Sequence, residues 1–154
     1  MGRIVRIAVA LGSNVGDRAA HLDFAAARLA GILSSLVVSR WYETVPVGVG
    51  PQPPFLNGAA TGVTHLPARA LLEMLLAVER DRGRERPFPG APRTLDLDLV
   101  LFGDQVLQES GLIVPHPRFR ERRFVLEPLA DIAPAMVDPV TGSTLTELLA
   151  RLRP

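Results

Sequence analysis

Apolar and polar positions along the chain change between a period of two residues and a helical period, and these changes outline the secondary structure. Alternating or β-branched runs predict strands at residues 4–11, 36–43, 55–64 and 95–102, with a short strand near Val106. Helical spacing predicts helices at 18–33, 67–82 and 141–152, and one or two short helices between 114 and 134. Thr144 and Glu147, in the last of these helices, have the spacing of a capping box. Pro/Gly-rich composition predicts loops at 45–54 and 83–93.

The order of these elements predicts the fold. A strand is followed by a helix, two strands, a second helix and a fourth strand, and then by a helical segment. The second and third strands are joined by the loop 45–54 without a helix, so they should pair antiparallel. A ferredoxin-like α+β sandwich satisfies this order, with a βαββαβ core, a mainly antiparallel sheet flanked by helices, and a C-terminal helical extension. We expect residues 1–154 to form a single domain, because the chain is short for two.

The amino-acid composition excludes several classes of protein. Without cysteine the chain has no disulfide, no catalytic thiolate and no Cys-bound zinc, which is compatible with a cytoplasmic location. Without lysine it has neither a Walker A loop nor a Schiff-base lysine. A formal net charge of +1 argues against a general nucleic-acid-binding surface. No apolar run reaches the ~18 residues that a membrane span needs.

The basic residues cluster in two parts of the chain. All 17 are arginines; five lie between Arg80 and Arg93, and four between Arg118 and Arg123. Since the guanidinium group is suited to bidentate contact with phosphate oxygens, the clusters favour a phosphorylated ligand. Solvated arginines are the alternative interpretation.

The strand that follows the second loop carries two carboxylates on one face. In RTLDLDLVLFGD (93–104) the leucines at 95, 97, 99 and 101 form one face, whereas the other begins with Asp96 and Asp98 and ends with Val100 and Phe102. Alternate Cα atoms are ~6.6–7 Å apart on a strand, so both carboxylates can reach toward one cation. Oxygen ligands favour Mg²⁺, and Mg²⁺ beside arginines is typical of a polyphosphate site. A solvated strand end is the alternative, because Asp-x-Asp is common.

Other residues are weaker candidates when taken alone. His116 lies among arginines in VPHPRFRERR, and Glu79 lies near the end of the second helix, where it is otherwise a plain surface residue. Phe55 and Asn57 flank the first loop, and an aromatic ring beside an amide is suited to reading a flat heterocycle. From these residues alone, however, a core Phe55 and a turn Asn57 are the favoured interpretation.

Taken together, the motifs resemble the 6-hydroxymethyl-7,8-dihydropterin pyrophosphokinase family of folate biosynthesis. The matching segments are ALGSNVGD, TVPVG, FLNGA, Glu79 followed by GRER, APRTLDLDLVLFGD and VPHPRFRERRFVLEPLADIAP. They occur in the family's order and spacing and span nearly the whole chain. The combination of PRTLDLD with a later VPHPR-x-x-x-RRF is highly specific, and the family has the ferredoxin-like fold expected above from element order.

The resemblance also implies a reaction. The β,γ-pyrophosphoryl group of ATP is transferred to the pterin hydroxymethyl oxygen, with release of AMP and without a covalent enzyme intermediate. Asp96 and Asp98 match the pair that holds two Mg²⁺ ions, and Arg84 and Arg93 match arginines that assist transfer. The expected partners are therefore ATP and the pterin alcohol, with neither nucleic acid nor membrane. We expect the enzyme to be cytoplasmic and monomeric.

The same resemblance assigns binding residues to both substrates. The ATP-binding positions of the family match Glu79, Arg86, Leu99, His116 and Arg122. The pterin-binding positions match Thr44, Val45, Val47, Phe55, Asn57 and Phe124. Among these, Phe55 and Phe124 would sandwich the pterin ring, and Asn57 would read its polar edge.

Two segments depart from the family pattern, and two other functions stay open. Many relatives carry Arg-Trp-Gly before Pro-Arg-Thr, where this chain has PFPGA with Phe88, and some have a glutamine where this chain has Leu76. A non-catalytic ferredoxin-like module would bind a phosphorylated ligand without turnover. A metal-dependent phosphodiesterase would use Asp96 and Asp98, but it would need more carboxylates or histidines close to them.

Overall fold

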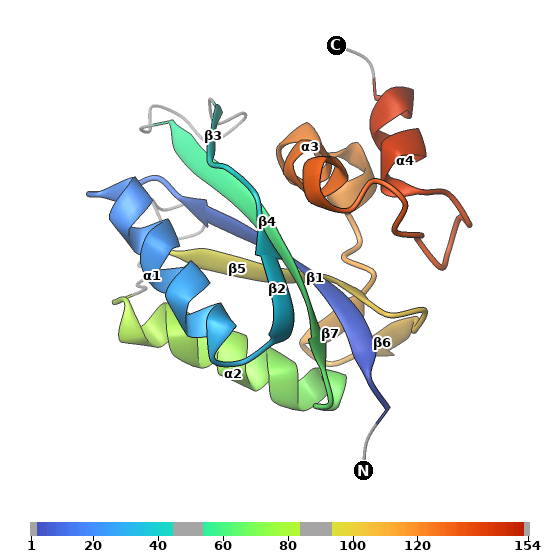
Figure 1. Cartoon of the computed structure of the whole chain (residues 1–154), viewed down its shortest axis with the longest axis horizontal. Coiled ribbons are helices and arrows are strands. Elements are labelled where there is room, and N and C mark those ends of the chain that lie inside the picture. Colours follow the sequence, from blue (N-terminus) through green and yellow to red (C-terminus); the bar gives the residue numbers. More distant parts are fainter. Residues whose placement is uncertain (1–2, 45–53, 84–93, 153–154) are drawn as a thin grey trace.

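A five-stranded sheet with helices on both sides is the framework of the molecule (Figure 1). The computed structural model describes residues 3–44, 54–83 and 94–152. In chain order these residues form β1 (Val5–Ser13), α1 (Arg18–Ala30), β2 (Ser34–Val38), β3 (Tyr42–Thr44), β4 (Phe55–Thr64), α2 (Ala68–Asp81), β5 (Asp96–Phe102), β6 (Leu107–Glu109), β7 (Leu112–Val114), the 3-10 helix η1 (Phe119–Glu121), α3 (Arg123–Ile132) and α4 (Leu145–Arg151).

The strands of the sheet pair antiparallel. β1 lies between β4 and β5, and both β2 and β3 pair with β4, so the strand order is β2-β4-β1-β5 with β3 also beside β4. β6 and β7 pair with each other in a separate two-stranded hairpin. The prediction of an α+β architecture with a mainly antiparallel sheet is therefore confirmed. β5, which carries both aspartates, is at the edge of the sheet.

Alternation along β1 directs side chains into two cores. Ile7 and Val9 belong to the core that contains the buried leucines of α1 and α2, whereas Ala8 and Ala10 belong to the core that contains those of α3 and α4. Figure 1 shows these two pairs of helices on opposite sides of the sheet. Both faces are thus covered over the middle of the sheet.

The prediction of one continuous strand at 36–43 is wrong. β2 ends at Val38 and β3 begins at Tyr42, so the segment forms two short strands. The Ser39 N–H still donates a hydrogen bond to the Ala59 carbonyl at 2.8 Å. The Trp41 ring occupies the space where a β-carbon of Gly58 would lie. This ring therefore packs against β4 at the point where the ladder is interrupted.

The predicted alternation along β5 is wrong at its C-terminal end. Val9 of β1 pairs with Leu99, but the next residue, Ala8, pairs with Leu101, so Val100 is an extra residue in β5. Such a bulge reverses the faces that follow it. Leu101 therefore packs on the α3 and α4 side, and Phe102 packs on the α1 and α2 side. Asp96 and Asp98 precede the bulge and keep the expected common face.

The ends of the helices follow local capping rules. Asp17 caps α1, since its Oδ1 accepts a hydrogen bond from the Ala20 N–H at 3.1 Å. The predicted capping box of Thr144 and Glu147 at α4 is confirmed. Pro67 is the N-cap of α2, so the helix begins at Ala68, one residue later than predicted. The short strand predicted near Val106 begins one residue later, as β6.

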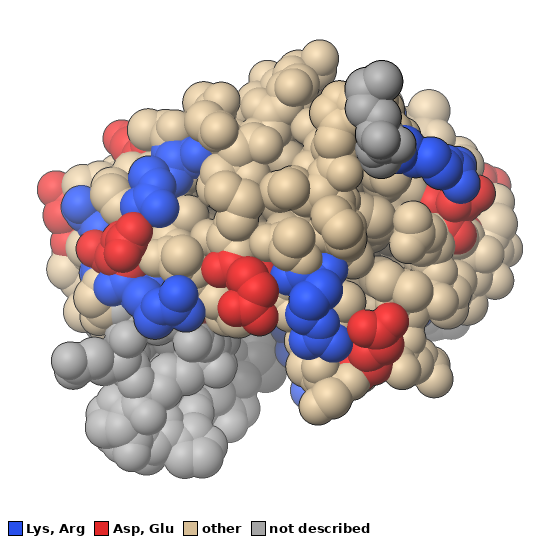
Figure 2. All heavy atoms as spheres, turned by 90° about the horizontal axis from the view of Figure 1, so that it is seen from below, with Lys and Arg blue, Asp and Glu red and all other residues tan. Residues whose placement is uncertain are grey.

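The face drawn in Figure 2 carries charged side chains of both signs. Basic and acidic side chains of the described residues lie interspersed there, without an extended region of one sign. None of the helices within residues 3–44, 54–83 and 94–152 has the length and apolar character needed to cross a bilayer.

Candidate active site

The site lies at one end of the sheet, where antiparallel pairing brings together the end of β1 and the starts of β4 and β5. Asp96 of β5 pairs with Gly12 of β1, and Gly12 pairs with Asn57 of β4. Directly opposed residues on neighbouring strands project from the same face of a sheet. Asp96, Gly12 and Asn57 therefore form a row that joins a carboxylate to an amide.

Gly12 leaves room for its neighbours in this row. A β-carbon at this position would lie 3.2 Å from Asn57 Oδ1 and 3.7 Å from Phe55 Cδ1. The first distance is tighter than ordinary contacts, so a side chain would displace its neighbours. Because position 12 is a glycine, the Asn57 amide and the Phe55 ring can lie close to β1. This is a physical reason for the glycine in the ALGSNVGD motif.

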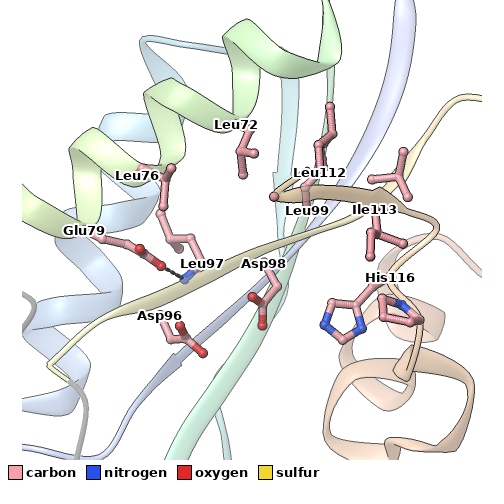
Figure 3. Close-up of a pocket in the computed structure, with 13 residues that line it drawn as sticks. Leu72, Leu76, Glu79, Asp96, Leu97, Asp98, Leu99, Leu112, Ile113 and His116 are labelled. Atoms are coloured by element: carbon pink, nitrogen blue, oxygen red, sulfur yellow. Dashed lines mark hydrogen bonds between the residues drawn. The ribbon is translucent and has the colours of Figure 1, made fainter. Parts of the chain in front are cut away.

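Asp96 and Asp98 extend from the same face of β5, and both are half-buried. Figure 3 shows their carboxylates on the same side of the strand. In the part of the chain that the structure describes, no group of three or more His, Cys, Asp or Glu is arranged to hold a metal ion. Mg²⁺ needs only one or two protein carboxylates when phosphate oxygens and water complete its shell. This donor set fits a magnesium ion that arrives with a nucleotide.

Glu79 attaches the strand of the aspartates to α2. Its side chain is 2% exposed, and its Oε2 accepts a hydrogen bond from the Leu97 N–H at 2.6 Å (Figure 3). Leu97 lies between Asp96 and Asp98 on the edge strand, so this bond holds the backbone from which both carboxylates extend. The interpretation of Glu79 as a plain surface residue is therefore wrong.

His116 lies beside the aspartates and is held by two backbone groups. Its N–H donates to the Val100 carbonyl at 2.9 Å, and its Nδ1 accepts from the Arg118 N–H at 3.1 Å. Burial lowers the pKa of His116, the Arg122 charge lowers it further, and the Asp96 charge opposes this shift. The imidazole is therefore neutral at neutral pH. Because Nδ1 accepts, its proton lies on Nε2, which is a hydrogen-bond donor.

A cavity of about 370 Å³ opens next to these groups, between α2, β5 and the β6–β7 hairpin (Figure 3). Its charged or ionisable lining residues are Glu79, Asp96, Asp98 and His116. Its remaining lining residues are Leu72, Leu76, Leu97, Leu99, Gly111, Leu112, Ile113, Val114 and Pro117. The volume suits a small organic ligand, and the mixture of apolar walls and a few polar groups is typical of such sites.

Most of the apolar lining was not singled out from the sequence. The family resemblance places Leu99 in the site, whereas Leu76 differs from the family pattern and has no predicted role. Leu72 and Ile113 have the spacing of ordinary core residues on a helix and a strand. The cavity next to them is created by the packing of three separate elements. The periodicity of apolar residues does not predict such packing.

The other half of the site contains Thr44, Phe55 and Asn57. Asn57 is 4% exposed and donates from Nδ2 to Thr44 Oγ1 at 2.5 Å. Asn57 lies inside β4, so its interpretation as a turn residue is wrong. Phe55 is half-buried and belongs to neither core of the described residues, so its interpretation as a core residue is also wrong. Thr44 and Phe55 are opposed in the β3–β4 ladder.

Two predicted residues lie at the start of α3. The Arg122 Cζ lies 5.5 Å from the centroid of the Phe124 ring, within the range of a cation–π contact. Phe124 is 41% exposed, which is unusual for an aromatic side chain of this size and leaves its ring available for stacking. The other predicted site residues, Val45, Val47, Arg84, Arg86 and Arg93, lie outside the described residues, as does Phe88.

Arg18 holds the end of the β3–β4 ladder and was not identified from the sequence. Its Nη1 donates to the Pro54 carbonyl at 2.8 Å, and its Nη2 donates to Glu43 Oε2 at 2.9 Å. Pro54 and Glu43 directly precede Phe55 and Thr44. An arginine in the first turn of a helix gives no local signal of such a role, because its partners are 25 and 36 residues away.

Comparison with known sequences gives one consistent family. A sequence model described as 7,8-dihydro-6-hydroxymethylpterin-pyrophosphokinase (HPPK) matches residues 8–134. A 2-amino-4-hydroxy-6-hydroxymethyldihydropteridine pyrophosphokinase of Pseudomonas aeruginosa is 42% identical over 149 residues, which cover 96% of this chain and 91% of the relative. The enzyme of the same name from Bacillus subtilis is 44% identical over 137 residues, covering 88% and 82%.

A solved structure shares the fold at low sequence identity. A crystal structure of Plasmodium falciparum HPPK-DHPS, a triple mutant with SDX-DHP, aligns with a TM-score of 0.74 and 16% identity. The alignment covers 97% of this chain but only 44% of the Plasmodium chain. This similarity concerns the fold alone.

Proposed function

The chain belongs to the 7,8-dihydro-6-hydroxymethylpterin-pyrophosphokinase family, and from this premise we propose how its own residues bind the substrates. It is an enzyme of folate biosynthesis that transfers pyrophosphate to the hydroxymethyl group of the dihydropterin. We infer that the donor is ATP, that the metal is Mg²⁺ and that the nucleotide product is AMP.

One observation carries this proposal. Asp96 and Asp98 lie between a mostly apolar cavity on one side and the row that leads to Asn57 on the other. A nucleotide in the cavity would direct its phosphates to the two carboxylates, and a pterin at Asn57 would direct its hydroxymethyl group to the same place. The reacting groups of both substrates would therefore meet at Asp96 and Asp98.

The cavity offers suitable groups for the nucleotide. Leucine side chains of α2 and β5 would contact the flat faces of the base, and backbone groups near Leu99 would meet its polar edge. His116, which donates from Nε2 when neutral, and Arg122 are suited to phosphate oxygens. Arg86 would add a further phosphate contact, as the family resemblance implies.

The transfer requires alignment more than acid–base catalysis. The pterin hydroxymethyl oxygen forms a bond to the β-phosphorus, the bond from this phosphorus to the oxygen that bridges to the α-phosphate breaks, and AMP leaves with that oxygen. The hydroxyl proton passes to solvent. Asp96 and Asp98 would hold Mg²⁺, with two ions expected, which when bound neutralises triphosphate charge and lowers the pKa of the hydroxyl. Arg84 and Arg93 would stabilise charge that develops during transfer.

The pterin half of the site would recognise a flat, polar ring. Asn57 is oriented by Thr44, so its Oδ1 has a defined direction toward a ring N–H or amino group. Phe55 and Phe124 supply aromatic rings for stacking, and Phe124 is exposed before any ligand binds. Val45 and Val47 would complete the pocket, as the resemblance implies.

We also propose the finer class of the fold. The strand order β2-β4-β1-β5, with α1 and α2 on one face, supports the ferredoxin-like βαββαβ arrangement when β2 and β3 are counted as one interrupted strand. A single domain over 1–154, a cytoplasmic location and a monomeric state remain predictions from the sequence.

The two other functions fit the site less well. A phosphodiesterase would need further carboxylates or histidines beside Asp96 and Asp98, and the described residues provide no metal-binding group of three or more. A non-catalytic module would have no need for a nucleotide-sized cavity whose Asp96 is joined by a row of opposed residues to Asn57, which shares β4 with Phe55.

The products of the reaction test the proposal. The protein is incubated with Mg-ATP and 6-hydroxymethyl-7,8-dihydropterin, and the nucleotides and pterins are separated by chromatography. We expect AMP and the pterin diphosphate in equal amounts, with no AMP when the pterin is omitted. Formation of ADP, or of AMP without pterin, would contradict the proposal. Binding of both substrates without turnover would favour the non-catalytic module.

A further inference from the structure

Four residues of α2 form a stripe along the side of the helix that faces the cavity. Arg69, Leu72, Leu76 and Glu79 follow one another at spacings of three, four and three residues, which places them on one face. The last three line the cavity, and Glu79 holds β5 through the Leu97 N–H (Figure 3). Arg69 continues the stripe one turn before Leu72.

Arg69 contacts the hairpin that forms the opposite wall. Its Nη1 donates to the Ser110 carbonyl at 2.9 Å, and its Nη2 donates to Glu109 Oε1 at 3.2 Å. Glu109 is the last residue of β6, and Ser110 follows it in the turn to β7. The turn residue Gly111, which lines the cavity, is close as well, since a β-carbon there would lie 3.8 Å from Arg69 Nη1.

The hairpin needs such a contact at its turn. β6 and β7 have three residues each and pair only with each other among the described strands. Two-stranded hairpins of this kind are marginally stable in water. Leu112 and Val114 anchor β7 in the core, but residues 108–111 are exposed. Among the contacts of the described residues, Arg69 supplies the hydrogen bonds that join this turn to α2.

We propose that Arg69 is a positioning residue for the nucleotide. By joining the hairpin turn to α2, it sets the separation between the wall formed by Leu72 and Leu76 and the wall formed by Gly111–Val114. Glu79 and Arg69 would thus hold the two borders of the cavity from opposite ends of one helix. This inference rests on the proposed function, because it takes the cavity to be the nucleotide site.

The effect of Arg69 on binding should be selective. In Arg69→Ala the turn would lose both hydrogen bonds. A smaller fraction of the molecules would then have the hairpin in the position that forms the cavity wall. We expect the KM for ATP, and the Kd for a non-hydrolysable Mg-ATP analogue, to rise about 3- to 10-fold, as is reasonable for the loss of two partly exposed contacts. The KM for the pterin alcohol and kcat should change less than about twofold, because Arg69 touches neither the pterin side nor the aspartates.

The matched control is Arg28→Ala. Arg28 also forms an exposed ion pair, with Asp81 at 2.7 Å, and the exposed fractions of the pair, 38% and 55%, are close to the 45% and 53% of Arg69 and Glu109. This pair joins α1 to the end of α2 and does not reach the hairpin, so nucleotide affinity should stay within about twofold of wild type. Glu109→Gln, which removes the ion pair but leaves the Ser110 bond, should give a smaller rise than Arg69→Ala.

A charge exchange provides the rescue. The double variant Arg69→Glu with Glu109→Arg restores an ion pair across the same gap, so it should bind the analogue more tightly than Arg69→Glu alone. Urea unfolding verifies that each variant is folded. An equal rise in both KM values, or nucleotide affinity unaltered in Arg69→Ala, would overturn the inference. Absence of pterin-dependent AMP formation by the wild-type protein would instead overturn the proposed function.

Discussion

Single residues at this site depend on neighbours that are distant in the sequence. Asp96 and Asp98 owe their common face to the strand period, but the residues that lie opposite Asp96, Gly12 and then Asn57, come from other strands. Glu79 gives another example. It is buried, and it accepts a hydrogen bond from an edge-strand N–H 18 residues later. A carboxylate near a helix end carries no local sign of this bond.

The metal role of the aspartates can be tested at the residue scale. Asp96→Asn keeps the size of the side chain but removes an anionic ligand, so we expect kcat to fall by ~10³-fold or more. The Mg²⁺ dependence of ATP-analogue binding should weaken as well, which is measured by titrating Mg²⁺ at fixed analogue. Asp104→Asn, at an exposed position of the turn after the same strand, is the control and should behave like wild type. Near-normal turnover of Asp96→Asn would refute the metal role.

At the scale of elements, the helices on one face of the sheet also hold the borders of the site. α2 contacts β5 through Glu79 and the hairpin through Arg69. α1 contacts the end of the β3–β4 ladder through Arg18, next to Thr44 and Phe55. These helices therefore do more than cover a core, because polar side chains in them fix strand ends that carry site residues.

Arg18 gives a prediction that complements the one for Arg69. In Arg18→Ala the ladder end at Thr44 and Phe55 loses its support, so the KM for the pterin alcohol should rise about 3- to 10-fold. The affinity for the ATP analogue should stay within about twofold, since Arg18 does not reach the cavity. Steady-state kinetics with each substrate varied in turn measure both effects.

A partial variant separates the two contacts of Arg18. Glu43→Gln removes the ion pair but leaves the bond to the Pro54 carbonyl, so its effect on the pterin KM should be smaller. A rise in the KM of ATP as large as that of the pterin would mean that Arg18 acts on the whole fold instead.

At the scale of the whole molecule, the site depends on two cores that share one sheet. The second core, under α3 and α4, also carries Arg122 and Phe124 at its border. We expect its stability to depend on Asp138, whose side chain is fully buried. Asp138 accepts two hydrogen bonds from Arg120, at 2.6 and 3.0 Å, and others from the Val140 N–H and the Thr141 hydroxyl. It thereby connects η1 to the turn before α4.

The ionisation of Asp138 links this connection to pH. Burial raises the pKa of Asp138, but hydrogen bonds from Arg120, Thr141 and Val140 together outweigh burial and hold the pKa below its ordinary value of 3.8. The folded state thus binds its proton less readily than the unfolded state. The resulting stabilisation is fully present above the ordinary pKa and is lost as the pH falls through the lowered pKa.

The predicted consequence is a stability difference that depends on pH. Asp138→Asn should lower the free energy of unfolding by about 2–3 kcal/mol at pH 7, because Arg120 loses its charged partner. Below about pH 4 the difference from wild type should narrow, because wild type then loses the same charge. Urea unfolding of wild type and Asp138→Asn, at pH 7 and again below about pH 4, measures this difference in the free energy of unfolding. Asp131→Asn is the control, because Asp131 is exposed. A difference that stays constant with pH would contradict this assignment.

The sequence by itself determined much of this protein. Period-two and helical spacing predicted the strands and helices, and the loop without a helix predicted antiparallel pairing of the strands that it joins. The spacing of three residues between Thr144 and Glu147 predicted their capping box. These features depend on interactions within a few residues, so local patterns carry them. The motifs around Asp96 and His116 identified the family for the same reason, because they are contiguous.

Only the tertiary structure decided how the site is assembled. The bulge at Val100, the burial of Glu79, the apolar cavity beside Leu99 and the contacts of Arg18 and Arg69 all join segments that are far apart in the chain. Leu72 and Ile113 have the same period whether they face a core or a cavity. The physical reason is that a pattern specifies which face of an element is apolar, whereas the packing of elements specifies what that face meets.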